Sequence, residues 1–562
     1  MHFRRISMNM PRFKLSPAVA LAAVVLLSTA WAAEEAPKIR LNSIGFLPDR
    51  EKKATIAVPC SGFAVVRVKD GAMVLEGTVG SSFMNPDTEE KLQVADFSAL
   101  KEPGEYQLDV PGVGRSAPFR VAASVYNEPF YVVTRGMYLW RCGTAVKASY
   151  HGQTFEHGPC HLNDAWMDLI TGEHVKVEST KGWHDAGDYN KYVINAGVTV
   201  GCMFRAWEDF PAIRKVKLDI PESGGPLPDF LAEIKWETDW LLTMQLPDGS
   251  VSHKVSTRSF GGFILPERET ADRFFVPWAS AATADFVAMM AQTSRYLRPY
   301  DAAYADRCLA AAGKSYGFLL ANPKNHNADM KGVTTGGYGT NDWDDRLWAA
   351  AELWEATGDV AVLKDLETRI AGPDAQGRVD ADFDWGNVKN LGLITYVLSS
   401  RPGRNEELVA KIRASFVATA DGIVQIAANH GYGRPLGTRY YWGGNGGVAR
   451  QTLVLMTAHR LSPKPEYVQT SLAALDHLFG RNYYGRSFVT GLGFRPPMFP
   501  HDRRSGGDNV VDPWPGYLVG GSHPGATHWQ DIQGDYRTNE IAINWNSALI
   551  YALAAFVDAS GQ

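Results

Sequence analysis

Two carboxylates with the potential for chemistry, Asp185 and Asp188, lie three positions apart in the segment WHDAGDYNKY at residues 183–192. Ala186 and Gly187 leave the backbone between them free of bulk, so both side chains can turn towards one point in a helical turn or tight loop. Such a pair can hold a water molecule between its oxygens. The alternative is that one Asp only caps the apolar run VINAGVTVGCMF, which predicts a helix. The flanking aromatic residues favour a reaction centre.

Glu540 is the candidate partner acid for that pair. Hydrolysis of a glycosidic bond needs a base for the water and an acid for the leaving oxygen. We expect Glu540 to open a strongly apolar helix, INWNSALIYALAAF, and a carboxyl against such a surface keeps its proton to higher pH. The alternative is a Glu placed at a helix N-terminus for its dipole, which would lower the pKa instead.

A second cluster has the residue types of a metal site. Cys142, Cys160, His161 and His184 supply two thiols and two imidazoles within one short segment, and four such ligands match tetrahedral zinc. Their spacing is not that of a zinc finger. A Cys142–Cys160 disulfide and an ordinary buried His184 are the alternatives. If zinc is bound, four protein ligands leave no open position for water, so its role is structural and it would fix the loop that enters Asp185.

Composition bounds the class of protein. A chain of 562 residues is too long for one ordinary core, and 45% apolar with 21% charged residues is typical of a globular protein. The net charge of -5 comes without any block of Lys or Arg, which argues against nucleic-acid and membrane-surface roles. Sixteen Trp and twenty-two Tyr indicate a cleft lined by flat apolar faces, which suit sugar rings, although most of these aromatics will be in the core.

Residues 1–32 have the pattern of a signal peptide. Basic residues precede an apolar run at 17–27, and Ala30-Trp31-Ala32 offers the small-x-small cleavage pattern. We therefore expect export to the periplasm or the medium, with a mature protein that starts at Ala33; a retained anchor is the alternative. No later stretch is long and uncharged enough for a membrane span, so no membrane contact is expected after cleavage. A monomer is expected.

The hydrophobic pattern divides the mature chain into two parts, which predicts a multidomain fold. Residues 38–122 contain short alternating stretches separated by turn residues, which predict an all-β immunoglobulin-like sandwich. Residues 124–562 contain about a dozen long amphipathic stretches, and the helical period is expected to continue throughout. A dozen helices predict an all-α (α/α)6 toroid of six inner and six outer helices, with functional residues in loops at one end.

Several motifs in the same order resemble one family. They are WHDAGDYNKY, LPDFLAEIKWETDWLLTMQLPDGSVSHKV, SAATADFVAMMAQTSR, DRLWAAAELWEATGD, FGRNYYGRSFVTGLG, PMFPHDRR and DYRTNEIAINWNSALIYALA. The chain is similar to glycoside hydrolase family 9, the inverting cellulases that often carry an N-terminal immunoglobulin-like domain. The resemblance implies that Asp188 is the general base, that Asp185 helps to hold the water, and that Glu540 is the general acid.

The resemblance also implies substrate-binding and metal-binding residues. His501 and Arg503 match sugar-contacting positions, and Trp442 in Tyr441-Trp442-Gly443-Gly444-Asn445 is expected to be a stacking platform. The family usually has a second His where this chain has Asp502, an acid that would favour a cationic sugar unless it pairs with Arg503 or Arg504. The Cys and His cluster falls where zinc-carrying members place ligands. Asp344 and Asp345 match a calcium-binding acid pair, with a solvated acidic loop as the alternative.

The leading hypothesis is an inverting glycoside hydrolase that cleaves β-1,4-glucosidic bonds in cellulose or cello-oligosaccharides. One alternative is an exo-acting enzyme of the same family, a β-glucosidase, cellobiohydrolase or exo-β-glucosaminidase. The other is a non-catalytic carbohydrate-binding protein. The trio Asp185, Asp188 and Glu540 argues against the last, because a binding module has no use for a proton donor placed opposite a water site.

Overall fold

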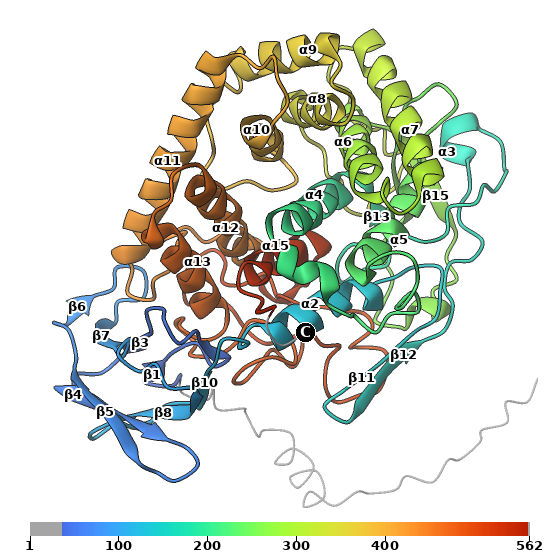
Figure 1. Ribbon diagram of the computed structural model, residues 1–562. Helices are drawn as coiled ribbons and strands as arrows, with labels where there is room; N and C mark the ends of the chain where they lie inside the picture. Colours follow the sequence, from blue (N-terminus) through green and yellow to red (C-terminus); the bar gives the residue numbers. More distant parts are fainter. Residues whose placement is uncertain (1–35, 560–562) are drawn as a thin grey trace, which may run out of the picture. The chain divides into compact units, whose positions relative to one another are not determined.

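A β-sandwich precedes a large helical region in the computed structural model, which describes residues 36–559 (Figure 1). The expected signal peptide lies outside the described residues. From Lys38 onward the chain falls into one unit by its internal contacts, yet it contains two separate hydrophobic cores. The smaller core belongs to the strands before residue 122, and the larger core belongs to the helices.

The sandwich has two sheets whose strands alternate between buried and outward positions. In GEYQLDV, for example, Tyr106, Leu108 and Val110 are buried and the residues between them are not, the period of two that a sheet packed on one face requires. One sheet has the order β1 (Ile39–Arg40), β3 (Lys53–Ile56), β7 (Lys91–Asp96), β6 (Phe83–Met84). The other has the order β2 (Gly45–Phe46), β10 (Phe119–Val121), β8 (Gly104–Val110), β4 (Gly62–Arg67), β5 (Met73–Thr78), and β9 (Gly114–Arg115) pairs with β8.

Within residues 36–559, twelve helices of ten or more residues follow the sandwich, in two sets. Most residues are buried in α4 (Val193–Asp209), α6 (Ser280–Leu297), α8 (Trp343–Thr357), α10 (Lys389–Leu398), α12 (Gly444–Leu461) and α15 (Ile543–Ala554). The second set consists of α2 (Asn127–Leu139), α5 (Asp229–Thr243) and α13 (Pro465–Leu478), which are buried over about two thirds of their residues, and of α7 (Ala302–Ala321), α9 (Val360–Ala371) and α11 (Glu406–Ala428), in which only a narrower set of positions is buried. In α11 that set is one stripe from Val409 to Ala427 at spacings of three and four, typical of an outer helix.

The first set forms the inner layer of the helical region (Figure 1). Helix α4 contacts α6 and α15, α6 contacts α8, α8 contacts α10, and α12 contacts α15. The outer helices each pack on inner ones, as α7 does on α6 and α9 on α8. This arrangement is consistent with the expected toroid.

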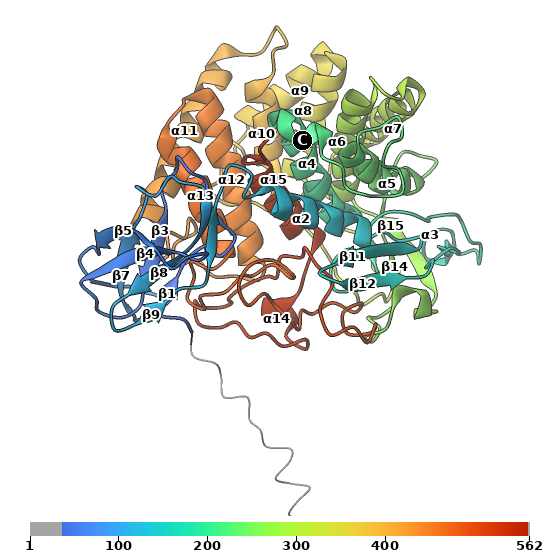
Figure 2. The same cartoon turned by 60° about the horizontal axis from the view of Figure 1, so that its bottom comes forward.

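The expectation that the period stays helical after residue 124 was wrong at two places. A hairpin forms from β11 (Val146–Tyr150) and β12 (Gln153–His157), and a small sheet from β13 (Lys191–Tyr192), β14 (Ser252–Thr257) and β15 (Arg273–Trp278). All six residues of β14 are buried, so the strand shows no alternation that the sequence could reveal. These strands and the short helix α14 (Tyr536–Asn539) lie at the same end of the helices (Figure 2).

The sandwich is joined to the helical region by buried polar contacts. Asp87 accepts hydrogen bonds from His430 Nε2 at 2.9 Å and from the Tyr440 hydroxyl at 2.7 Å. Asn85 Oδ1 accepts from the Gly431 backbone N–H at 3.1 Å. Burial opposes ionisation of Asp87, but the hydrogen bonds from His430 and Tyr440 and the charge of His430 together outweigh it and lower the pKa of this carboxyl. The sandwich therefore supports the segment that leads, two residues after Tyr440, to Trp442.

Replacing Asp87 with Ala is expected to lower the melting temperature. The change leaves two buried donors without their acceptor, which costs on the order of 2 kcal/mol in the free energy of unfolding. Asp49→Ala is the matched control, because Asp49 is an exposed acid of the same domain. Differential scanning calorimetry of both variants checks the result. Equal melting temperatures for the two would show that the junction contributes nothing to stability.

Candidate active site

The segment with Asp185 and Asp188 forms a tight loop between the Arg141–Trp183 bridge and β13, as expected. The Asp185 backbone N–H donates to Asn190 O at 3.0 Å, and the Ile543 N–H donates to Asp185 O at 2.9 Å. Gly187 sits so close to the next segment that a Cβ there would lie 2.2 Å from His501 O. Only glycine therefore permits the contact that brings residues 501–503 against this loop.

Asp185 is buried and held by two donors. Its Oδ1 accepts from Asn195 Nδ2 at 2.8 Å and its Oδ2 from the Tyr338 hydroxyl at 2.7 Å. Burial, followed by the negative charge of Asp188, raises the pKa of Asp185 to about 8. Tyr338 itself has a left-handed backbone with φ of +42°, a conformation that costs energy in a bulky residue and recurs at functional sites.

Asp188 has a different environment. Its Oδ2 accepts from Asn190 Nδ2 at 2.5 Å and from the Tyr192 hydroxyl at 3.2 Å. Burial raises the pKa of Asp188 as well, but the charge of Arg503 opposes that shift. When one of two close carboxylates carries a negative charge, ionisation of the other is disfavoured. The positive charge of Arg503 favours ionisation of Asp188 over Asp185. Of the two acids, Asp188 is therefore the better placed to carry the negative charge.

Glu540 lies beside the same loop. It directly follows α14, in a bridge with His501, and α15 begins three residues later at Ile543, so the expectation that Glu540 opens this helix was wrong. Burial raises the pKa of Glu540 well above its ordinary range, the charges of Asp188 and Asp185 raise it further, and a hydrogen bond from the Gly187 backbone opposes the shift. The Gly187 N–H thus brings Glu540 within reach of both aspartates.

A loop between β14 and β15 forms another wall of this site. Phe260 is 54% exposed and its ring lies under the Arg503 guanidinium, 5.7 Å from its centroid. Phe263 packs edge to face on His501 with ring centroids 5.2 Å apart, and His501 Nδ1 hydrogen-bonds Gln533 O at 2.8 Å. Exposed aromatic rings beside an arginine and an imidazole are suited to sugar rings. Sequence reasoning missed both phenylalanines because no spacing marks a loop position as a cleft wall.

Asp502 pairs with Arg504 and does not face an open site. The carboxylate accepts from Arg504 Nε at 3.0 Å, and both side chains are 1% exposed. The interpretation of Asp502 as an internal ion-pair partner is confirmed. The carboxylate of Asp502 is therefore not available to bind a cationic sugar.

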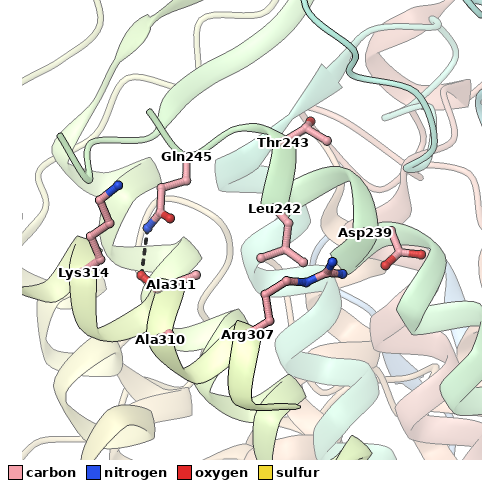
Figure 3. A pocket seen from close by; sticks show the side chains of 8 residues that line it. All are labelled: Asp239, Leu242, Thr243, Gln245, Arg307, Ala310, Ala311 and Lys314. Atoms are coloured by element: carbon pink, nitrogen blue, oxygen red, sulfur yellow. Dashed lines mark hydrogen bonds between the residues drawn. The ribbon is translucent and has the colours of Figure 1, made fainter. Parts of the chain in front are cut away.

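Trp442 is 46% exposed and lines a hollow of about 370 Å³ together with Trp385 and Tyr441. The Trp385 ring packs edge to face on Tyr338, whose hydroxyl holds Asp185. The Trp385 side of the hollow is thus linked to Asp185 through the Tyr338 side chain. A larger hollow of about 500 Å³ between α5 and α7, lined by residues such as Arg307 and Lys314, contains none of the candidate residues (Figure 3).

The four predicted metal ligands converge. One ligand atom from each of Cys142, Cys160, His161 and His184 lies within 4.8 Å of all the others, and no other such group occurs within residues 36–559. Cys142 Sγ is 3.6 Å from His161 Nδ1, and Cys160 Sγ is 3.8 Å from His184 Nε2. All cysteines in the described range are free, so the disulfide alternative was wrong. Two thiols and two imidazoles at this spacing fit a tetrahedral metal such as zinc.

The predicted calcium pair has other surroundings. Asp344 Oδ2 accepts from the Val388 backbone N–H at 2.6 Å, and Asp345 is fully buried beside Asp285. Neither residue belongs to the metal-ligand group found in the described chain. The alternative of a solvated acidic loop was wrong, because both acids are buried in the first turn of α8. Calcium binding by this pair stays a prediction.

Comparisons with known proteins agree on one family. The profile described as Glycosyl hydrolase family 9 matches residues 126–553, and the profile described as Cellulase N-terminal ig-like domain matches residues 34–115. Endoglucanase D of Acetivibrio thermocellus is 59% identical over 525 residues, which cover 93% of this chain and 83% of that protein.

Solved structures give the same result. A metagenome-derived family 9 endoglucanase superposes with a TM-score of 0.86 at 33% identity, covering 92% of this chain and 98% of that one. A Zn-binding triple mutant of a family 9 endoglucanase, J30, superposes with a TM-score of 0.85 at 32% identity, covering 91% of this chain and 99% of that one.

Proposed function

The chain belongs to glycosyl hydrolase family 9, and we propose on that premise that it is an inverting endo-β-1,4-glucanase acting on cellulose chains or cello-oligosaccharides. It is a glycoside hydrolase. The observation that carries the proposal is the gathering of Asp185, Asp188 and Glu540 around Gly187, with the pKa of Glu540 raised and the charge of Arg503 acting on both Asp188 and Glu540. The name of the 59% identical relative supports the choice of substrate.

In this mechanism a water molecule is held between Asp185 and Asp188. Asp188, ionised beside Arg503, takes a proton from the water as it attacks the anomeric carbon. Glu540, whose burial keeps it protonated, gives its proton to the leaving glycosidic oxygen on the other face of the sugar. Inversion requires an acid and a base about 6.5–9.5 Å apart, so that the water fits between base and sugar. A β-linked chain would thus yield an α-configured reducing end.

Three further side chains are proposed to bind the sugar chain. Trp442, exposed above the hollow with Trp385, offers a flat apolar face. His501 and Arg503 lie on the segment that contacts the acid loop at Gly187, which puts their polar groups next to the reacting bond. Loop positions at one end of a ring of helices can surround an extended chain, which favours internal cleavage.

Product analysis tests the proposed function directly. The purified protein is expected to lower the viscosity of carboxymethylcellulose quickly relative to the release of reducing ends, as internal cleavage does. On cellopentaose, proton NMR in the first minutes should show the α-anomer at the new reducing end. Release of only glucose or cellobiose from chain ends would favour the exo-acting alternative, and cleavage of chitosan oligomers alone would favour a glucosaminidase. No cleavage of any of the three would contradict the hydrolase assignment.

Structural zinc at Cys142, Cys160, His161 and His184 is part of the proposal. The four ligand atoms leave no position for a catalytic water, so the ion would brace the chain that leads from His184 into Asp185. The fit of the donor set and the name of the Zn-binding neighbour support this.

Removing the metal is expected to lower the melting temperature by on the order of 5 °C or more, while kcat at room temperature persists in chain that stays folded. A zinc-selective chelator is used, with a calcium-selective one as a check on Asp344 and Asp345. Elemental analysis should find zinc in the parent protein and in Cys60→Ser, whose thiol is outside the cluster, but not in Cys160→Ser. Active, folded protein without zinc would overturn the assignment.

The remaining parts of the proposal concern organisation and location. We take residues 38–122 as the immunoglobulin-like domain and 124–562 as an (α/α)6 catalytic toroid, supported by the two hydrophobic cores and the two helix sets. Export after removal of residues 1–32 rests on the sequence pattern. In the described part of the chain, no helix combines the length and the apolar character that crossing a bilayer requires. A monomer remains the expected state.

A further inference from the structure

We propose that Glu269 is a positioning residue that fixes Arg503 in the substrate cleft by tying it to the metal-ligand cluster. The inference rests on the proposed function, since it assigns Arg503 a role in binding the sugar chain. Glu269 lies on the loop between β14 and β15 that also carries Phe260 and Phe263, and it is far in sequence from His161 and Arg503. No motif in the sequence pointed to it.

The Glu269 carboxylate bridges two functional groups with its two oxygens. Oε2 lies 3.3 Å from His161 Nε2, and Oε1 lies 3.3 Å from Arg503 Nη1. The side chains of Glu269 and Arg503 are each 6% exposed and that of His161 is 2% exposed. Buried and charge-assisted contacts of this kind hold their geometry far better than exposed pairs, because water does not compete for the same atoms.

The His161 side of the bridge has the form of a carboxylate–histidine–metal arrangement. Nδ1 of His161 faces Cys142 Sγ, so this nitrogen is the one directed into the cluster. Nε2 then carries the proton and donates it to Glu269, which fixes both the tautomer and the orientation of the ring. The carboxylate is thereby anchored to a residue of the metal-ligand cluster.

The Arg503 side lacks any other ionic anchor. Within residues 36–559 the only ion pair of Arg503 is with Glu269. The guanidinium otherwise lies over the rings of Tyr189 and Phe260, each 5.7 Å from the ring centroid, and stacking leaves an arginine free to slide. Its backbone N–H, bonded to Gly187 O at 3.1 Å, fixes the main chain but not the side chain. Glu269 therefore determines where the five donors of Arg503 point.

Losing this anchor should weaken binding more than chemistry. If the Arg503 side chain is ordered only when the sugar chain binds, binding loses side-chain rotamer entropy. If the side chain is already fixed in the free enzyme, binding does not carry this cost. The expected signature is a higher KM and a higher Kd with a nearly unchanged kcat. A loss that arises only from poorer folding would lower the amount of active enzyme and leave KM as it was.

The test compares Glu269→Gln with Glu267→Gln, an exposed acid two residues away on the same loop. On cello-oligosaccharides, E269Q is expected to raise KM about tenfold with kcat within about threefold of the parent, and E267Q is expected to leave both unchanged. Zinc content and melting temperature are recorded for each variant. The Kd of the cello-oligosaccharide, measured by tryptophan fluorescence, does not depend on the fraction of protein that is folded. It therefore remains informative for a variant that folds poorly.

A double-mutant cycle with Arg503→Ala tests whether Glu269 acts through Arg503. If Glu269 acts through Arg503, E269Q changes KM by less than about twofold in the R503A background, because its partner is already absent. The inference would be overturned if E269Q raised KM by the same factor in the parent and in R503A, or if E269Q alone left KM unchanged. These results leave the proposed function standing as long as the parent enzyme cleaves β-1,4-glucan. An inactive parent would contradict the proposed function instead.

Discussion

Replacing Glu540 with Gln is expected to lower kcat on cello-oligosaccharides by about 10²–10⁴-fold and to leave oligosaccharide binding intact. The amide has almost the same size but no acidic proton, so the glycosidic oxygen would have to leave as an alkoxide. The measurement is steady-state kinetics together with calorimetric binding of cellotetraose. Unchanged turnover would refute the acid assignment.

A substrate with an activated leaving group provides the matched control for E540Q. A dinitrophenyl group leaves without protonation, so the variant should hydrolyse a dinitrophenyl cello-oligosaccharide much closer to the parental rate. The pH profile gives a second control. Because burial and the nearby aspartates raise the pKa of Glu540, the parent stays active above the range of an ordinary carboxyl and loses activity as rising pH removes that proton. This alkaline limb should disappear in E540Q.

Replacing Asp188 with Asn is expected to lower kcat by about 10²–10⁴-fold as well, because no group is left to take the proton from the attacking water. The amide keeps the shape of the site and can still contact Asn190 and the Tyr192 hydroxyl, which hold Asp188 Oδ2 in the parent. KM should change little. Kinetics on cellopentaose measures the effect.

Azide separates the base role of Asp188 from a merely structural one. Azide needs no deprotonation, and it is small enough to take the place of the water, so it should restore turnover in D188N. The product from a β-linked substrate should be the α-glycosyl azide, which NMR identifies. Failure of rescue together with a lowered melting temperature would mean that Asp188 matters for folding, and a β-azide would exclude the inverting geometry.

Particular residues show what could be predicted from the sequence. Asp185 and Asp188 stood out because their spacing, with Gly187 between them, is a local property, and the close contact at Gly187 explains why that spacing works. The cysteine and histidine ligands were recognisable by residue type alone. Helices such as α11 followed from their apolar stripe, whereas β14, buried on every side, carried no periodic signal.

The rest was decided by contacts between segments far apart in the sequence. Tyr338 reaches Asp185 across 153 residues, and Glu269 reaches Arg503 across 234, and neither partner is marked by any local pattern. The pKa of Glu540 also depends on burial and on two charges from a distant loop, which no inspection of its neighbours along the chain could supply. The sequence by itself determined which groups can do the chemistry. Only the tertiary structure decided which of them meet, because charge, burial and hydrogen bonding act through space.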